Sequence, residues 1–242
     1  MDRMAQTALN SLKMLMENQT ATAHNLANLT TPGYRQDVVT DFSSIYLDRQ
    51  KGMEPRIVSS RNTGGFSVEQ GVLESTQNPL DLAIGNDGYF VIQPKNGGQP
   101  SLSRRGDFQT SENGELLDGA GNKVLDGGLQ PLVLPAFREI TISPQGEVFI
   151  TPIGAEPDEL PQNIGVIATY TPEENDRLKK TLDGHIRIES EPNDDGATEL
   201  VNIEPNQQAK IVIGFLEKSN VNAVEEMVNT IDQQRKFEMH VK

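Results

Sequence analysis

The sequence of 242 residues predicts an α+β protein in which a helix at each end of the chain flanks a mainly antiparallel β middle domain. Three observations predict this class. Neither proline nor glycine occurs in residues 1–31, and neither occurs after Gly214, so a helix can run uninterrupted at both ends. Between the ends, short stretches of alternating apolar residues are separated by closely spaced turn residues, as is typical of an antiparallel barrel or sandwich.

The N-terminal segment is rich in alanine, leucine, methionine and glutamine, which all favour helix. Its residues fall into columns at the seven-residue spacing of a coiled-coil seam. One column contains Ala5, Leu12, Gln19 and Leu26, and the column that pairs with it contains Met1, Ala8, Leu15 and Thr22. Asn28 and the run Thr30-Thr31-Pro32-Gly33 are expected to end the helix.

A second helix is expected near the C-terminus, where either Ser219 or Asn222 can cap its first turn and Glu225 follows Asn222 by three positions. A heptad seam continues along this helix through Val221, Val224, Val228 and Ile231. Because the chain leaves one helix and returns to the other, we expect the two to form an antiparallel, coiled-coil-like pair. Each helix offers only a narrow seam, so the pair either packs on its own β domain or becomes ordered on assembly into a polymer, which we favour.

Three β-hairpins are predicted between the helices. They join Leu80–Ile84 to Tyr89–Ile92 across Asn86-Asp87-Gly88, Phe108 to Leu116-Leu117 across Glu112-Asn113-Gly114, and Ile140–Ile142 to Val148–Ile150 across Ser143-Pro144-Gln145-Gly146. Further strands are expected at Ile164–Tyr170 and Ile186–Ile188.

The chain is therefore expected to have four parts. These are an N-terminal helix of the axial core over residues 1–35, an extended connecting segment over 36–75, a β-rich middle domain over 76–214, and a C-terminal helix over 215–242 that pairs with residues 1–35. The stretches 154–162 and 189–198 are expected to be solvent-exposed acidic loops.

Composition and charge exclude several classes of function. With no cysteine, the chain cannot form disulfides, thiolate zinc sites or iron–sulfur clusters. The net charge of −14 lies in the middle of the chain, which makes nucleic acid a poor partner, whereas the near-neutral ends suggest contact with other protein. The longest apolar run, Ile211 to Leu216, is too short to cross a bilayer, and we expect no cleaved signal peptide.

No enzymatic motif was found. The three histidines lack the spacing of a metal site, and no nucleophile or nucleotide-binding motif occurs. We therefore expect no catalytic residue, cofactor or metal. A secreted carbohydrate-binding or hydrolytic β domain is kept as an alternative from another class, although a chain without tryptophan has little to stack on a sugar.

Three blocks of sequence resemble the bacterial flagellar axial proteins, the family of rod, hook and hook-associated proteins. The first is the stretch NLANLTTPGY at residues 25–34, which is similar to the segment that closes the family's first helix. The second is NPLDLAIGNDGYFV at 78–91, continued by RGDF at 105–108 and NGEL at 113–116. The third, at 217–238, contains EKSNVN, EMV and QRKFE. The blocks stand in the family's order and span nearly the whole chain.

The resemblance implies a non-enzymatic structural subunit of the flagellar basal-body rod that polymerises helically into the drive shaft and export channel. Its start and short length resemble a proximal-rod member, with a distal-rod or hook subunit as the alternative. It implies export through the flagellar type III apparatus without signal cleavage, and a location in the rod within the periplasmic space. The implied partners are further copies, other proximal and distal rod proteins, the export apparatus and, as a further candidate, the periplasmic rings.

The resemblance also implies which residues meet at assembly. Apolar residues of the two helices would be buried between subunits: Leu12, Leu15, Leu26, Val221, Val224, Val228 and Ile231. Asn25 and Asn28 would cap the first helix or form hydrogen bonds at the turn into Pro32-Gly33, which also belongs to the assembly interface. Ser219 and Asn220 would do the same at the start of the second helix. For these polar residues, local capping alone is an equal alternative.

Overall fold

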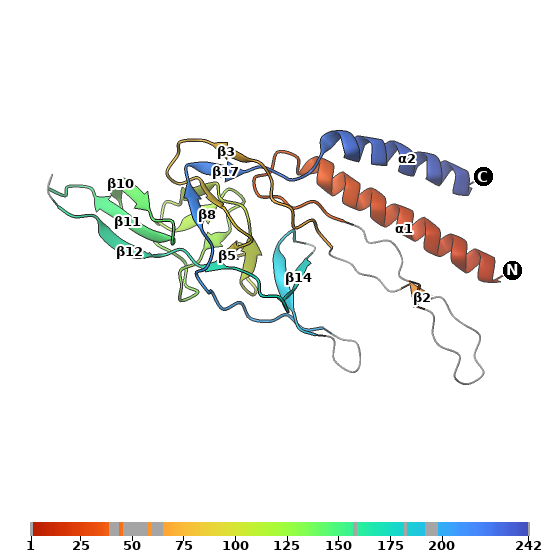
Figure 1. Ribbon diagram of the computed structural model, residues 1–242, viewed down its shortest axis with the longest axis horizontal. Helices are drawn as coiled ribbons and strands as arrows, with labels where there is room; N and C mark the ends of the chain where they lie inside the picture. Colours follow the sequence, from red (N-terminus) through yellow and green to blue (C-terminus); the bar gives the residue numbers. More distant parts are fainter. Residues whose placement is uncertain are drawn as a thin grey trace.

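The computed structural model describes residues 2–38, 44–45, 58–59, 65–156, 159–181, 183–191 and 198–241. The described part is elongated. Two helices project from one end of a β body, and the sheet formed by β10 (Phe137–Ile142), β11 (Glu147–Pro152) and β12 (Gln162–Val166) lies at the other end (Figure 1). The predicted α+β class is confirmed.

The helices are α1 (Asp2–Ala27) and α2 (Ala223–Val241). They lie side by side, with both chain ends at the tip farthest from the β body (Figure 1). Gln233 Nε2 on α2 donates to Thr22 Oγ1 on α1 at 3.1 Å, so the contact between the helices includes polar groups. α2 begins eight residues after position 215, because Phe215–Glu217 form a strand instead of a helix.

The rest of the described chain is mostly β. Its other strands are β1 (Ser44–Ile45), β2 (Val58–Ser59), β3 (Leu73–Ser75), β4 (Leu82–Ile84), β5 (Tyr89–Gln93), β6 (Ser101–Ser103), β7 (Phe108–Thr110), β8 (Leu116–Asp118), β9 (Lys123–Val124), β13 (Thr169–Tyr170), β14 (Arg177–Lys180), β15 (Ile186–Glu189), β16 (Ile211–Ile213) and β17 (Phe215–Glu217). The pairs among the described strands are antiparallel.

The largest sheet separates two apolar cores. Its strands follow the order β14-β15-β6-β5-β9-β8-β7, and β13 also pairs with β5. Because side chains alternate across a strand, Phe90 and Ile92 of β5 pack into one core, with residues of β4, β10 and β11. Tyr89 and Val91 pack into the other core, with residues of β15. The alternation that predicted a strand here therefore serves two cores.

Two of the three predicted hairpins are confirmed. β7 pairs with β8, and β10 pairs with β11 in the register Ile140↔Ile150 and Ile142↔Val148. Gly114 and Gly146 have positive φ angles of 80° and 89° in the connecting turns, which glycine adopts without steric cost. The predicted strand at 186–188 is present as β15, whereas the predicted strand at 164–170 is divided between β12 and β13 in different sheets.

The hairpin predicted for Leu80–Ile92 is wrong in its pairing, although both strands exist. β4 pairs with β16, near the C-terminus, and β5 pairs with β6, β9 and β13. A two-residue hairpin turn built on Asp87-Gly88 needs positive φ angles, and neither residue has one. The carbonyl groups of Asn86 and Gly88 instead accept hydrogen bonds from the side chain of Arg104.

The last two strands tie the end of the chain to its first half. β16 pairs with β4 and β17 pairs with β3, in the register Glu217↔Leu73. β3 belongs to the stretch 36–75, much of which lies outside the described residues. Of the two predicted acidic loops, residues 157–158 and 192–197 also lie outside them. Among the described residues of the first loop, Leu160 is 82% exposed.

Candidate functional site

The segment that follows α1 is bonded to the start of the C-terminal region. The His24 carbonyl at the end of the helix accepts two hydrogen bonds from Asn28, one from its main-chain amide at 3.1 Å and one from Nδ2 at 2.9 Å. Five residues later, the Gly33 amide donates to the Glu217 carbonyl at 2.7 Å. Gly33 has a φ of +67°, and a Cβ atom there would lie 2.3 Å from the Arg104 main chain. The positive φ angle and the close approach to Arg104 therefore both favour glycine where this segment crosses the β body.

A buried cluster of three charges lies beside this crossing. Glu217 Oε1 is 3.0 Å from Arg35 Nη2, and Glu217 Oε2 is 2.9 Å from Arg104 Nε. The Gly71 amide also donates to Glu217 Oε1 at 2.9 Å. All three charged side chains are almost fully buried. Burial lowers the pKa of Arg104, an effect that the Glu217 carboxylate opposes.

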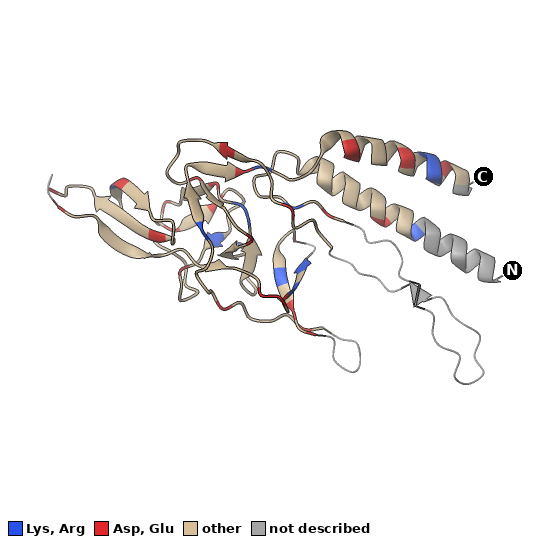
Figure 2. Ribbon diagram, viewed as in Figure 1, with Lys and Arg blue, Asp and Glu red and all other residues tan. Residues whose placement is uncertain are grey.

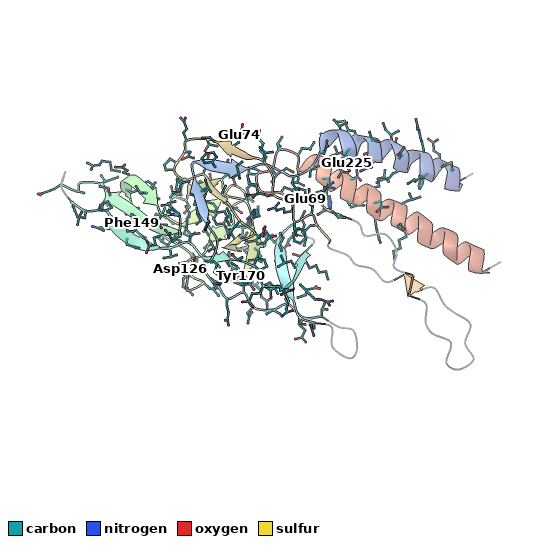
Figure 3. All side chains as sticks on the ribbon, viewed as in Figure 1. Glu69, Glu74, Asp126, Phe149, Tyr170 and Glu225 are labelled. Carbon is teal, nitrogen blue, oxygen red and sulfur yellow. The ribbon has the colours of Figure 1, made fainter. Side chains whose placement is uncertain are left out.

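Both guanidinium groups also bind main-chain oxygens. Arg35 donates to the Glu69 carbonyl, and Arg104 donates to the carbonyls of Asn86 and Gly88. Arg104 in addition lies over the Tyr89 ring, 5.6 Å from its centroid. Figure 3 labels Glu69 and Glu225 at the base of the helix pair, where these segments meet.

A second polar network joins the two helices at their inner ends. Asn25 Nδ2 on α1 donates to Glu226 Oε1 on α2 at 2.7 Å, and Gln36 Nε2 donates to the same oxygen at 2.8 Å. Asn25 Oδ1 accepts from the Asp37 amide at 2.7 Å. Asn220 Oδ1 accepts from the Gln36 amide, also at 2.7 Å. Asn25 and Asn220 therefore bond groups distant in sequence, beyond local capping.

Lys180 of β14 fastens the same segment from the side of the large sheet. Its ammonium group donates to the Asp37 carboxylate and to the Arg35 carbonyl, and it lies 3.7 Å from the centroid of the Tyr34 ring. Burial lowers the pKa of Lys180, while Asp37 acts in the opposite direction. Burial, followed by the nearby Asp37 charge, raises the pKa of Tyr34.

The outer side of α2 carries a stripe of exposed apolar side chains. Val224, Val228 and Ile231 are 71%, 52% and 50% exposed. Met227 belongs to the same stripe and is also exposed. Glu226, which faces α1, follows Val224 by two residues, or about 200° around a helix. The apolar stripe therefore lies on the side of α2 opposite to its contact with α1.

The predicted assembly residues fall into two groups. Those at the inner ends of the helices are buried or half-buried: Asn25, Asn28, Pro32, Gly33, Ser219, Asn220 and Val221. Leu15 and Leu26 are half-buried, and the α2 residues Val224, Val228 and Ile231 are exposed. The side chain of Leu12 lies outside the described residues.

The sequence-based prediction omitted the buried charged residues at the place where the helices meet the β body, which we call the junction. These residues are Arg35, Arg104, Glu217 and Glu226. One signal for Glu217 was available, because this carboxylate directly follows the longest apolar run of the chain. The charges are otherwise scattered over the sequence and meet only through the fold. Figure 2 shows acidic residues distributed over the β body as well as at the junction.

Two further classes of site were sought. Within the described ranges, neither helix is long and apolar enough to cross a membrane. No cluster of three or more histidine, aspartate or glutamate side chains suited to a metal ion occurs in that same part of the chain.

Comparisons with known proteins agree on one class of relative. The family description "Flagellar basal body rod FlgEFG protein C-terminal" matches residues 213–242, and "Flagellar hook protein FlgE/F/G D1 domain" matches residues 83–150. The flagellar basal-body rod protein FlgF of Salmonella typhimurium is 29% identical over 242 residues, which cover 100% of this chain and 92% of the relative.

Of two further relatives, one matches nearly the whole chain and the other matches about half of it. The FlgF protein of Mesorhizobium japonicum is 31% identical over 233 residues, covering 94% of this chain and 86% of the relative. The flagellar hook protein FlgE of Brucella abortus is 33% identical over 132 residues, which cover 52% of this chain and 31% of the hook protein.

Proposed function

The chain belongs to the family of flagellar basal-body rod proteins FlgF, and from this premise we propose that its two terminal helices form the surface through which it assembles. The chain is a structural subunit of the rod in the bacterial flagellum, and it is not an enzyme. It assembles with other flagellar rod or hook subunits. The carbohydrate-binding alternative is set aside, because the relatives are structural proteins.

The apolar stripe on α2 carries this proposal. A helix that packs only on its partner would direct its apolar side chains toward that partner. α2 instead directs Glu226 and Gln233 toward α1 and leaves Val224, Val228 and Ile231 in solvent. Burying these side chains in water-free contacts is favourable, at roughly 25 cal/mol per Å² of apolar surface. The stripe is therefore suited to contact a neighbouring subunit.

The helix pair is proposed to act as one antiparallel, coiled-coil-like unit, with residues 1–35 and 215–242 forming an axial core domain. On the surface that meets other subunits, Leu12, Leu15 and Leu26 would supply apolar residues from α1, and the stripe would supply them from α2. The segment 36–75 would connect this core to the β domain at 76–214. Summed over many neighbours in a helical polymer, weak contacts of this kind form a rigid shaft.

A position in the proximal rod is proposed for the subunit. The full-length matches to FlgF proteins support this position over the hook, because the hook match covers only half of the chain. A distal-rod position remains the alternative. Export through the flagellar type III apparatus, without signal cleavage, is supported by the lack of cysteine, since a disulfide would obstruct the passage of an unfolded chain.

The location is tested by purifying basal bodies from a strain that carries a tagged copy, followed by mass spectrometry. We expect the chain to co-purify with rod and ring proteins in basal bodies that lack hook and filament. Cross-linking in the same particles should yield links to proximal-rod proteins, whereas links to hook protein alone would favour the alternative position. Absence from the particles would contradict the proposed rod position.

The assembly surface is tested by placing charge in the apolar stripe. Val228→Glu and Ile231→Glu together should abolish incorporation into basal bodies and motility, because two carboxylates would be buried between subunits without partners. The unfolding midpoint of the free protein should stay within a few degrees of the wild type, since both side chains are already exposed.

Asn229→Glu is the control for this test, because it adds a negative charge directly beside Val228 on an exposed position outside the stripe. It should support motility. Normal incorporation of the double variant would show that the stripe is not an assembly contact.

A further inference from the structure

Glu217 connects three parts of the chain that are far apart in the sequence. Its carboxylate binds Arg35, which follows α1, and Arg104, which follows β6 in the body. Glu217 itself ends β17, six residues before α2 begins. One buried carboxylate therefore lies where the routes to both helices meet the β domain.

The charges of this cluster are unequal in number. Two guanidinium groups share one carboxylate, and each charged side chain is at most 3% exposed. Buried charges need partners, and removing one partner of such a set costs far more than losing an exposed ion pair. Loss of Glu217 would leave two buried cations facing each other. Loss of Arg35 would leave a balanced pair between Glu217 and Arg104.

We propose that Glu217 is a positioning residue, which holds the bases of both helices against the β body and so fixes the direction in which the helix pair projects. Within this cluster, Arg35 holds the segment that follows α1, because it lies in that segment and pairs with Glu217. The main chain supports the same contact, because the Gly33 amide donates to the Glu217 carbonyl and the Gly71 amide to its carboxylate. The importance of this role for assembly rests on the function proposed above for the helices.

Hydrogen–deuterium exchange of the full-length protein tests the proposal region by region. In Glu217→Gln, amides in residues 31–38 and 219–226 should exchange at least tenfold faster than in the wild type. Amides of β11, at the far end of the β body, should keep their wild-type rates, because β11 pairs with β10 and β12 and none of the cluster residues lies in these strands. Unchanged rates near the helices, or an equal rise in β11, would overturn the proposal.

Arg35→Gln is the second variant, because it keeps the balanced pair and so tests the proposal even where Glu217→Gln unfolds. Exchange should rise at least tenfold in residues 31–38 and stay unchanged in 219–226 and β11. Glu74→Gln is the control: Glu74 of β3 also pairs with a cation, Lys218 directly after β17, but both side chains are exposed, and the paired atoms are 3.0 Å apart. This control should exchange as the wild type does. A rise in 219–226 equal to that in 31–38 would contradict the assigned role of Arg35.

Incorporation into basal bodies separates this proposal from the proposed function. Glu217→Gln should incorporate at least tenfold less than the wild type, together with faster exchange at the helix bases. The stripe variant should fail to incorporate while its exchange stays normal. Absence of the wild-type chain from basal bodies would contradict the proposed function only, because the exchange measurement still decides the role of Glu217.

Discussion

Gly33 illustrates at the scale of one residue why the junction depends on sequence at single positions. The segment after α1 crosses the β body so closely that a Cβ atom on Gly33 would lie 2.3 Å from the carbonyl carbon and oxygen of Arg104. Main-chain atoms cannot move aside as the end of a flexible side chain can. The glycine thus satisfies two demands, a positive φ angle and a close approach.

Gly33→Ala should therefore lower the free energy of unfolding by about 3 kcal/mol or more, the sum of a left-handed conformation, which costs about 1–2 kcal/mol, and a main-chain clash. Urea unfolding measures this loss. Gly97→Ala is the control, because Gly97 has a φ of +78° and no atom within 4 Å of the added Cβ. In Gly97→Ala the free energy of unfolding should fall only by the cost of the left-handed conformation, about 1–2 kcal/mol. An equal fall in the free energy of unfolding in both variants would show that the main chain around Gly33 moves aside without a stability cost.

Residue-level prediction from sequence succeeded where chemistry is local and failed where it is not. Asn28 and Gly33 belong to a contiguous motif, and the turn that it predicts is present. The bond from Asn25 to Glu226 joins residues 201 positions apart, and the ion pairs of Glu217 with Arg35 and Arg104 span 182 and 113 positions. Such pairs depend on which strands meet, so the composition of the sequence alone could not assign them.

At the scale of elements, the first turn of α2 has a defined cap. Asn222 Oδ1 accepts from the Val224 amide at 3.1 Å and from the Glu225 amide at 3.5 Å. Ser219, the other residue predicted as a candidate cap, accepts only from the Val221 amide before the helix. The structure thus selects Asn222 as the N-cap of the helix.

Asn222→Ala should weaken the first turn of α2 by about 1 kcal/mol, the usual contribution of an N-cap. Amide exchange of residues 224 and 225 should become several-fold faster, and Ser219→Ala should leave these two amides unchanged. Faster exchange in the serine variant alone would contradict the assignment of the cap.

The predicted strands were more reliable than their pairing, for a physical reason. Alternation of apolar residues reports that a strand has a buried face, and this holds for β4 and β5 alike. It carries no information about the neighbour of each strand. β4 finds its partner, β16, more than 120 residues later, and the turn at Asp87-Gly88 lacks the positive φ angles that would have closed a hairpin.

At the scale of the whole molecule, the helix pair and the β body differ in the contacts that stabilise them. The body has two apolar cores, whereas the helices are fastened chiefly at their inner ends by the junction. Helices whose described side chains take no part in these cores open most easily from their free ends. The expectation from sequence, that the ends become ordered on assembly, remains a prediction.

Limited proteolysis of the free subunit should cut the outer parts of both helices first and leave, within minutes, a fragment that still contains the buried Asn25 and Glu226, because local opening is easiest where burial is least. Mass spectrometry of the fragments gives the sites of cleavage. The same helices should resist cleavage in isolated basal bodies. Protection of both helix tips in the free subunit would contradict the coupling of order to assembly.

The position of the two chain ends has a practical consequence for imaging. Both ends lie at the tip of the helix pair, so a fluorescent protein fused at either end would occupy the surface proposed for assembly (Figure 1). The turn after β11 lies at the opposite extreme of the molecule. There Ile153 is largely exposed, and Gly154 has no atom within 4 Å of an added Cβ. A short epitope or a dye-labelled cysteine placed at this turn would report on the subunit while leaving the helices untouched.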